Sequence, residues 1–150
     1  MKKIIAVVIL IATIFTLCAC NMNRTITPAE YDSTFDGVYI VIDSVSGDGK
    51  NEKLNVTWHN ETEYDVMYGY GYSIEYFRDG EWVKTQFKDF AIIEIACWVS
   101  PGTTSDMSYK TEYFNLLIEG KYRLSVDFYV HNKADGSTGA TSYAYFTVTK

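Results

Sequence analysis

In the stretch LNVTWH, residues 54–59, the apolar side chains of Leu54, Val56 and Trp58 alternate with polar ones. Successive side chains of a β-strand point to opposite faces, so this alternation predicts a strand with one buried and one solvated face. β-branched and aromatic residues are also the types that strands prefer. We therefore expect a sheet whose Trp58 face packs into a core.

The same period-two pattern recurs along the chain on both sides of this stretch. It is clearest in residues 122–130, where Tyr122, Leu124 and Val126 alternate with Arg123 and Ser125. In chain order, strands are expected at 38–42, 54–59, 70–76, 82–83, 92–99, 107–113, 122–130 and 143–149.

Turn signals separate these strands and indicate how they connect. Asp79-Gly80 lies between two β-rich runs, which is a strong hairpin signal, and Asp135-Gly136 suggests a closing hairpin. A short helix over 110–119 is an alternative for that segment, because Tyr113 and Leu117 would share a face. Seven or eight short strands with turns between them predict an all-β, antiparallel sandwich.

The N-terminus has the parts of a secretory signal peptide. Lys2 and Lys3 precede an apolar run that extends to Ala19, and polar residues follow. A retained transmembrane anchor and simple secretion are the alternatives. The run is shorter than the roughly 20 apolar residues that a spanning helix needs, so we predict a signal peptide at residues 1–19.

The residues at the end of this segment carry a more specific signal. Leu17 to Cys20, LCAC, resembles the lipobox of bacterial lipoproteins, in which the cysteine thiol is acylated before cleavage. The resemblance implies that Cys20 is lipidated and that the membrane is a partner, with the protein held on the extracytoplasmic face of the cell membrane. Residues 20–36 are polar, contain Pro28 and lack periodicity, which predicts a flexible tether before a domain at 37–150.

Composition narrows the function classes. The chain has 13 Lys and Arg against 19 Asp and Glu, and loss of Lys2 and Lys3 with the signal peptide gives a net charge of −8. Nucleic-acid binding draws its affinity from clustered basic residues, so nucleic acid is not an expected partner. With Cys18 removed and Cys20 acylated, Cys97 has no disulfide partner, and its apolar neighbours predict a buried thiol.

Five segments carry a family resemblance: 37–46, 54–59, FRDGEWV at 77–83, the strand before Pro101-Gly102, and LIEGKYRL at 117–124. Together they resemble the bacterial Ig-like domains of low-GC Gram-positive surface proteins. The resemblance covers about residues 37–130 and implies an Ig-like sandwich without catalytic residues. It does not extend to the polar loop HNKADGSTGA at 131–140.

No pattern in the sequence points to an active site or a cofactor. His59 and His131 each stand at the polar end of a strand, and no signature of a cysteine hydrolase surrounds Cys97. Two histidines and one cysteine fall short of a zinc site. Asp48 and Asp135 lie in turns that lack the spacing of a calcium loop. We therefore expect no enzyme activity, metal or cofactor.

Four tyrosines are the candidate binding residues, because they recur at two-residue spacing. Aromatic rows can stack on sugars or anchor proteins, but tyrosine is also an ordinary strand residue that packs across a sheet. Gly69 and Gly71 between them suggest a bulge or a close approach of another segment. The candidate residues are Tyr68, Tyr70, Tyr72 and Tyr76.

These observations favour a non-enzymatic, membrane-anchored lipoprotein whose Ig-like domain is an interaction or spacer module, with a protein or the cell wall as a possible partner. The alternative is a protein that binds cell-wall glycan or a small ligand through the tyrosine-rich face.

Overall fold

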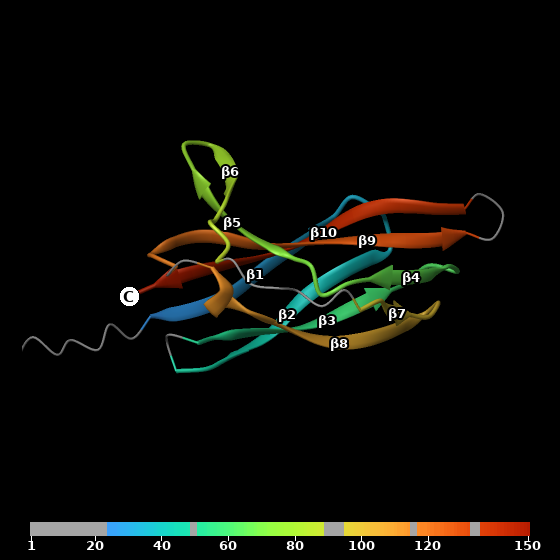
Figure 1. Cartoon of the computed structure of the whole chain (residues 1–150), viewed down its shortest axis with the longest axis horizontal. Coiled ribbons are helices and arrows are strands. Elements are labelled where there is room, and N and C mark those ends of the chain that lie inside the picture. The colour runs from blue at the N-terminus through green and yellow to red at the C-terminus, as the bar shows by residue number, and fades with distance from the viewer. Residues whose placement is uncertain (1–23, 49–50, 89–94, 115–116, 133–135) are drawn as a thin grey trace, which may run out of the picture.

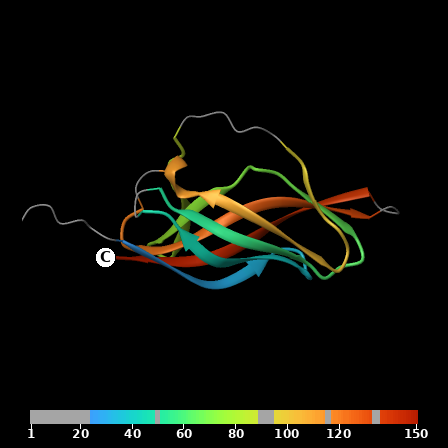
Figure 2. The same cartoon turned by 90° about the horizontal axis from the view of Figure 1, so that it is seen from below.

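The computed structural model describes residues 24–48, 51–88, 95–114, 117–132 and 136–150, which form two antiparallel β-sheets packed face to face (Figures 1 and 2). The all-β sandwich predicted from the sequence is confirmed. The strands are β1 (Thr25–Ser33), β2 (Val38–Ser46), β3 (Lys53–Asn60), β4 (Asp65–Tyr68), β5 (Ser73–Arg78), β6 (Glu81–Lys84), β7 (Cys97–Val99), β8 (Thr103–Lys110), β9 (Gly120–Asn132) and β10 (Gly136–Thr149).

The smaller sheet has the order β2-β3-β8, and the larger one has the order β1-β10-β9-β4-β7. Strand β9 organises the larger sheet. It pairs with β10 from Gly120 to Asn132, and its other edge pairs first with β5 and then with β4. Strands β5 and β6 form a hairpin that projects from the sandwich in Figure 1.

The predicted alternation in residues 54–59 sets the inner face of β3. Leu54, Val56 and Trp58 are all buried there. The Trp58 ring stacks on Tyr68 of the opposite sheet at 4.4 Å between centroids and meets Phe128 edge-on at 5.7 Å. Its indole N–H donates to the Tyr109 hydroxyl at 3.3 Å, so the buried polar atom is satisfied.

The tether prediction is wrong for part of its range, because Thr25–Ser33 forms β1 at the edge of the larger sheet. This strand pairs antiparallel with β10 from Thr25 opposite Thr149 to Ser33 opposite Ser142. Period-two alternation is missing because an edge strand is largely exposed and because the register shifts between Pro28 and Tyr31.

A buried ion pair fastens the start of β1 to the sandwich. Arg24 makes a bidentate contact with the Glu52 carboxylate, and the two side chains are only 8% and 5% exposed. The Arg24 guanidinium also donates to the Leu117 carbonyl at 3.3 Å, and the Thr111 hydroxyl donates to Glu52. In the sequence, Arg24 follows Cys20 by four residues.

The turn predictions hold where the structure describes them. Asp79 and Gly80 both have positive φ, 53° and 89°, as a two-residue type I′ hairpin requires. Gly47 has φ 139°, and a Cβ there would lie 2.5 Å from the Asn51 carbonyl oxygen, so only glycine fits. Strands β9 and β10 form the expected closing hairpin, although Asp135 lies outside the described residues.

Other predictions need correction or lie outside the described residues. The strand predicted at 70–76 begins only at Ser73, as β5, and β4 at Asp65–Tyr68 was not predicted. A helix at 110–119 was the alternative prediction for that segment. Its described part contains only a 3₁₀ turn at Thr111–Tyr113, because β8 already occupies Thr103–Lys110. Of the strand predicted at 92–99, the described part holds β7. Residues 1–23, with the predicted signal peptide and Cys20, are not among the described residues.

We predict that Arg24→Leu lowers the free energy of unfolding by about 3 kcal/mol, because it leaves the Glu52 carboxylate buried without its partner. The double variant Arg24→Leu/Glu52→Leu should recover part of this loss, since it removes the uncompensated charge. Urea unfolding followed by tryptophan fluorescence measures both.

The matched control is Arg78→Leu. Arg78 pairs with Asp79 on the surface, where the two side chains are 67% and 89% exposed. The unfolding midpoint of Arg78→Leu should therefore equal that of the wild type. Equal midpoints for Arg24→Leu and Arg78→Leu would contradict a structural role for the Arg24 contact.

Candidate functional site

The larger sheet is interrupted at Gly69–Tyr72. Pairing of β4 with β9 ends at Tyr68 opposite Phe128, and pairing of β5 begins at Ser73 opposite Ser125. Four residues on one side thus oppose two on β9, so the chain bulges away from the sheet. The bulge that Gly69 and Gly71 suggested is confirmed.

The structure does not bring the four candidate tyrosines together as one exposed row. Tyr68 is 3% exposed and packs on Trp58, while Tyr72 packs against Tyr109 and Phe114. Tyr76 is half-buried against Tyr122. Three of the four therefore pack into or against the core. This is the ordinary structural role that the sequence analysis gave as the alternative to ligand binding.

The ionisation of the inward tyrosines reflects this burial. Desolvation raises the pKa of Tyr68 and of Tyr72 above the ordinary value, although each hydroxyl has a partner. The Tyr72 hydroxyl donates to the Lys110 carbonyl at 2.5 Å, and the Tyr68 hydroxyl lies 3.3 Å from that of Ser105. These groups are satisfied structural contacts.

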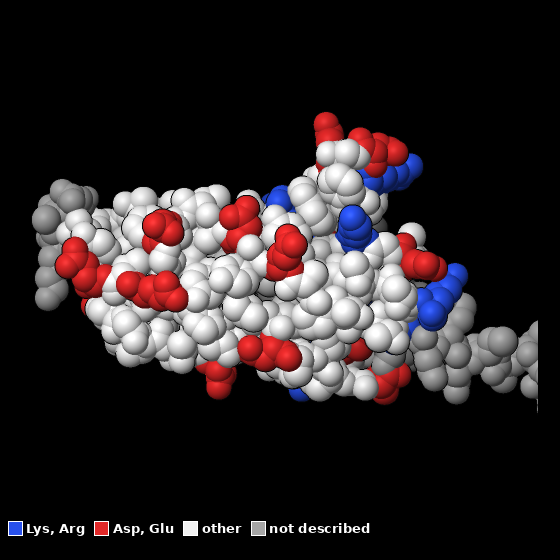
Figure 3. Space-filling model, turned by 180° about the vertical axis from the view of Figure 1, so that it is seen from behind, with Lys and Arg blue, Asp and Glu red and all other residues white. Residues whose placement is uncertain are grey.

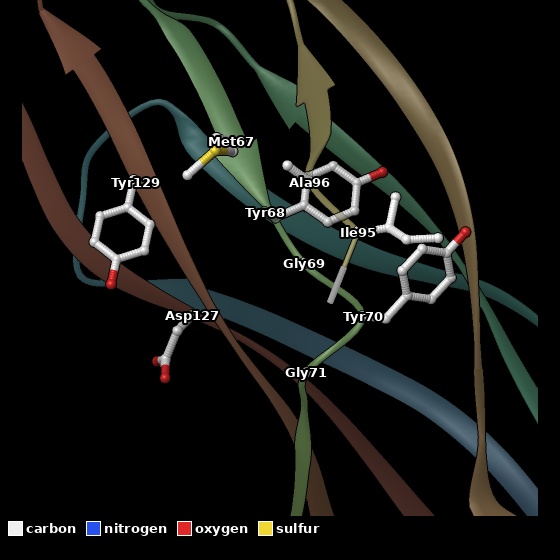
Figure 4. A pocket seen from close by; sticks show the side chains of 9 residues that line it. All are labelled: Met67, Tyr68, Gly69, Tyr70, Gly71, Ile95, Ala96, Asp127 and Tyr129. Carbon is white, nitrogen blue, oxygen red and sulfur yellow. The ribbon is translucent and has the colours of Figure 1, made fainter. Parts of the chain in front are cut away.

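Tyr70 is the exception, because the bulge turns it outward. It is 41% exposed and lines a groove of about 590 Å³ next to the interruption. Figure 4 shows Asp127 and Tyr129 projecting from β9 on one side, Tyr70 and Ile95 on the other, and the two glycines between them. The groove is also lined by Met67, Tyr68, Gly69, Gly71 and Ala96.

An aromatic row continues from this groove across the outer face of the larger sheet. Met67 of β4 lies opposite both Tyr129 of β9 and Trp98 of β7. Tyr129 is 49% exposed, and Trp98 is 53% exposed. We call Met67, Tyr70, Ile95, Trp98 and Tyr129 the aromatic face.

Sequence reasoning missed most of the aromatic face, although a signal for it was present. Arg123 and Ser125 are the polar residues of the strand predicted at 122–130, and Asp127 and Tyr129 follow them at the same parity. Trp98 likewise follows Cys97, whose thiol is predicted to be buried, so alternation places Trp98 at an outward position. An aromatic side chain at an outward position of a strand is the feature that marks such a surface.

A second group of surface rings lies across β1, β2 and β3. Tyr31 stacks on Tyr39 at 4.4 Å, and Tyr39 stacks on His59 at 4.7 Å. The Tyr39 hydroxyl donates to the Glu61 carboxylate at 2.7 Å, which is the main reason why the pKa of Tyr39 is raised to about 12. These stacks tie the edge strand β1 to the neighbouring sheet.

The described residues gather no catalytic or metal-binding set. Cys97 is half-buried against the core, whereas His131 contacts Trp98 and lies 2.7 Å from the Ser137 hydroxyl. In the described ranges there is no group of three or more His, Cys, Asp or Glu placed to hold a metal ion. Asp48 accepts a hydrogen bond from the Asn51 amide, which is turn chemistry as expected.

Nor do the described residues contain a helix long and apolar enough to cross a membrane.

Two face-to-face antiparallel sheets with this topology define an immunoglobulin-like sandwich. A family model described as bacterial Ig-like domain matches residues 34–147, and the chain belongs to that family. The match begins after β1, so β1 and the ion-paired Arg24 just before it precede the matched residues. A comparison with curated proteins found no match.

We predict that Glu61→Gln lowers the pKa of Tyr39 from about 12 toward the ordinary tyrosine value of about 10, because the carboxylate that accepts its hydrogen bond is lost. Ring signals in an NMR pH titration report this pKa directly. The neighbouring Glu63→Gln variant should leave it unchanged, and an unchanged value in Glu61→Gln would show that the contact does not form.

Proposed function

We propose that this chain is an extracytoplasmic lipoprotein, anchored to the cell membrane through Cys20, whose Ig-like domain is a non-enzymatic interaction domain. The observation that carries the anchoring is the LCAC stretch at residues 17–20, which follows an apolar segment and precedes polar residues. Each buried methylene of an acyl chain contributes about 0.8 kcal/mol, so two or more chains hold a protein stably on a bilayer.

The position of Arg24 supports this arrangement. Cys20 and Arg24 are four residues apart, a span of at most about 14 Å, so the ion pair of Arg24 with Glu52 would hold one end of the sandwich close to the lipid. Strands β1, β3 and β9 all begin at that end, while the loop at residues 60–65, the end of β9 and the start of β10 lie at the other (Figure 1). The anchored end and the free end would thus be distinct.

An interaction role is favoured over a purely spacing role by the aromatic face. A spacer needs no exposed Trp98 or Tyr129, whereas exposed aromatic side chains are the residues that binding surfaces use. Recognition of a glycan through the row of four tyrosines is less well supported, because Tyr68 and Tyr72 are committed to the core.

The anchoring is tested by mass spectrometry of the mature N-terminus together with membrane fractionation. We expect an N-terminal residue at Cys20 with the added mass of its acyl chains, and a Cys20→Ser variant that loses this mass and leaves the membrane fraction. Cys97→Ser is the matched control and should remain on the membrane. A mature protein whose Cys20 carries no acyl chain would contradict the proposal.

A further inference from the structure

The described basic residues of this domain are concentrated in one part of it, and the charged residues in the rest of the described chain are all acidic. All Lys and Arg side chains among the described residues lie toward the end that carries Arg24, or on the β5–β6 hairpin. Residues 31–45, 55–72, 95–108, 124–132 and 136–144 make up the rest of the sandwich and contain neither. On the face seen in Figure 3, blue groups are confined to the half nearer the N-terminal tail. The acidic residues of this basic-free part are Asp32, Asp36, Asp43, Glu61, Glu63, Asp65, Asp106 and Asp127.

The aromatic face lies in this basic-free part. Tyr129 and Trp98 are each about half exposed; Asp127 lies on β9 with Tyr129, and Asp65 lies on β4 with Met67. Asp127 is solvent-exposed and accepts one hydrogen bond, from the Thr141 hydroxyl at 2.7 Å. Aromatic rings and carboxylates therefore occur together in this part, and the described residues place no Lys or Arg beside them.

The other half of the same sheet face shows the contrasting arrangement. There Arg123 lies 4.0 Å from the ring of Tyr143 and 4.7 Å from that of Trp82, and it pairs with Glu75 at 2.6 Å. At this position the protein's own Arg123 guanidinium occupies the space between two aromatic rings and a carboxylate. In the aromatic face, no Lys or Arg among the described residues makes a cation–π contact with the rings of Trp98 or Tyr129.

We propose that the aromatic face binds a basic, extended segment of a protein partner, whose Lys or Arg side chains lie over Trp98 and Tyr129 and pair with Asp127. Cations are attracted to the faces of aromatic rings, and the apolar stems of Lys and Arg can pack along the groove beside Tyr70. The surrounding acidic surface attracts such a segment and repels anionic polymers.

A neutral glycan fits these observations less well. Sugars bind through stacking combined with several placed hydrogen-bonding groups, and the side chains that line the groove supply one carboxylate and the tyrosine hydroxyls. The charge division also has no role in binding a neutral ligand. The proposal deepens the interaction role proposed above and does not depend on the acylation of Cys20.

The test measures binding of a fluorescent nine-residue peptide of alternating Arg and Gly to the full-length protein as purified from its producing cells. Fluorescence anisotropy gives the affinity. We expect Trp98→Ala and Tyr129→Ala each to weaken binding about tenfold, and Asp127→Asn to weaken it several-fold. Raising the salt concentration should weaken binding to the wild type as well.

The controls separate this surface from general attraction to an acidic protein. Phe77→Ala removes an aromatic ring of similar exposure, 44%, from the β5–β6 hairpin and should bind like the wild type. A peptide with Glu in place of Arg should not bind. Thermal unfolding of each variant confirms that the domain is folded.

Two results would overturn the proposal. One is equal binding of the Arg peptide by the wild type, Trp98→Ala and Tyr129→Ala. The other is binding of a neutral N-acetylglucosamine oligomer that depends on Trp98 while the Arg peptide does not bind. Either outcome can occur whether or not Cys20 is acylated, so the interaction and the anchoring are tested separately.

Discussion

The contact of Trp58 with both sheets is the constraint on which the rest of this structure depends. Its ring stacks on Tyr68 and meets Phe128 on the larger sheet, while its indole N–H is bonded to Tyr109 of its own sheet. A ring of this size contributes a large share of the buried apolar area, and its satisfied N–H avoids the cost of an unpaired buried donor. The relative position of the sheets is fixed at this point.

This contact also determines what faces outward. Because Tyr68 packs inward on Trp58, strand alternation turns Met67 to the solvent side, where it lies opposite Trp98 and Tyr129. The bulge that follows Tyr68 then turns Tyr70 outward, so that it lines the adjoining groove. The aromatic face is thus a consequence of the core packing, and its position far from Arg24 follows from the direction of the strands.

Sequence patterns predicted the features that depend on local alternation and turn chemistry. The inner face of β3 and the Asp79-Gly80 hairpin are examples. They did not predict β1, because an edge strand is stabilised by pairing with a distant segment and needs no apolar alternation. The sequence patterns also wrongly placed Tyr68 and Tyr70 on one face. A bulge changes the face to which a side chain points without changing the spacing of residues in the sequence.

Hydrogen exchange of the tryptophan indole protons tests the packing of the two sheets most directly. We predict that the Trp58 indole proton, which is buried and hydrogen-bonded to Tyr109, exchanges only through opening of the domain, whereas that of half-exposed Trp98 exchanges rapidly. NMR spectra recorded after transfer into deuterated buffer distinguish the two, with Trp58→Phe and Trp98→Phe variants for assignment. Rapid exchange at Trp58, or protection at Trp98 equal to that of Trp58, would contradict the packing on which the aromatic face depends.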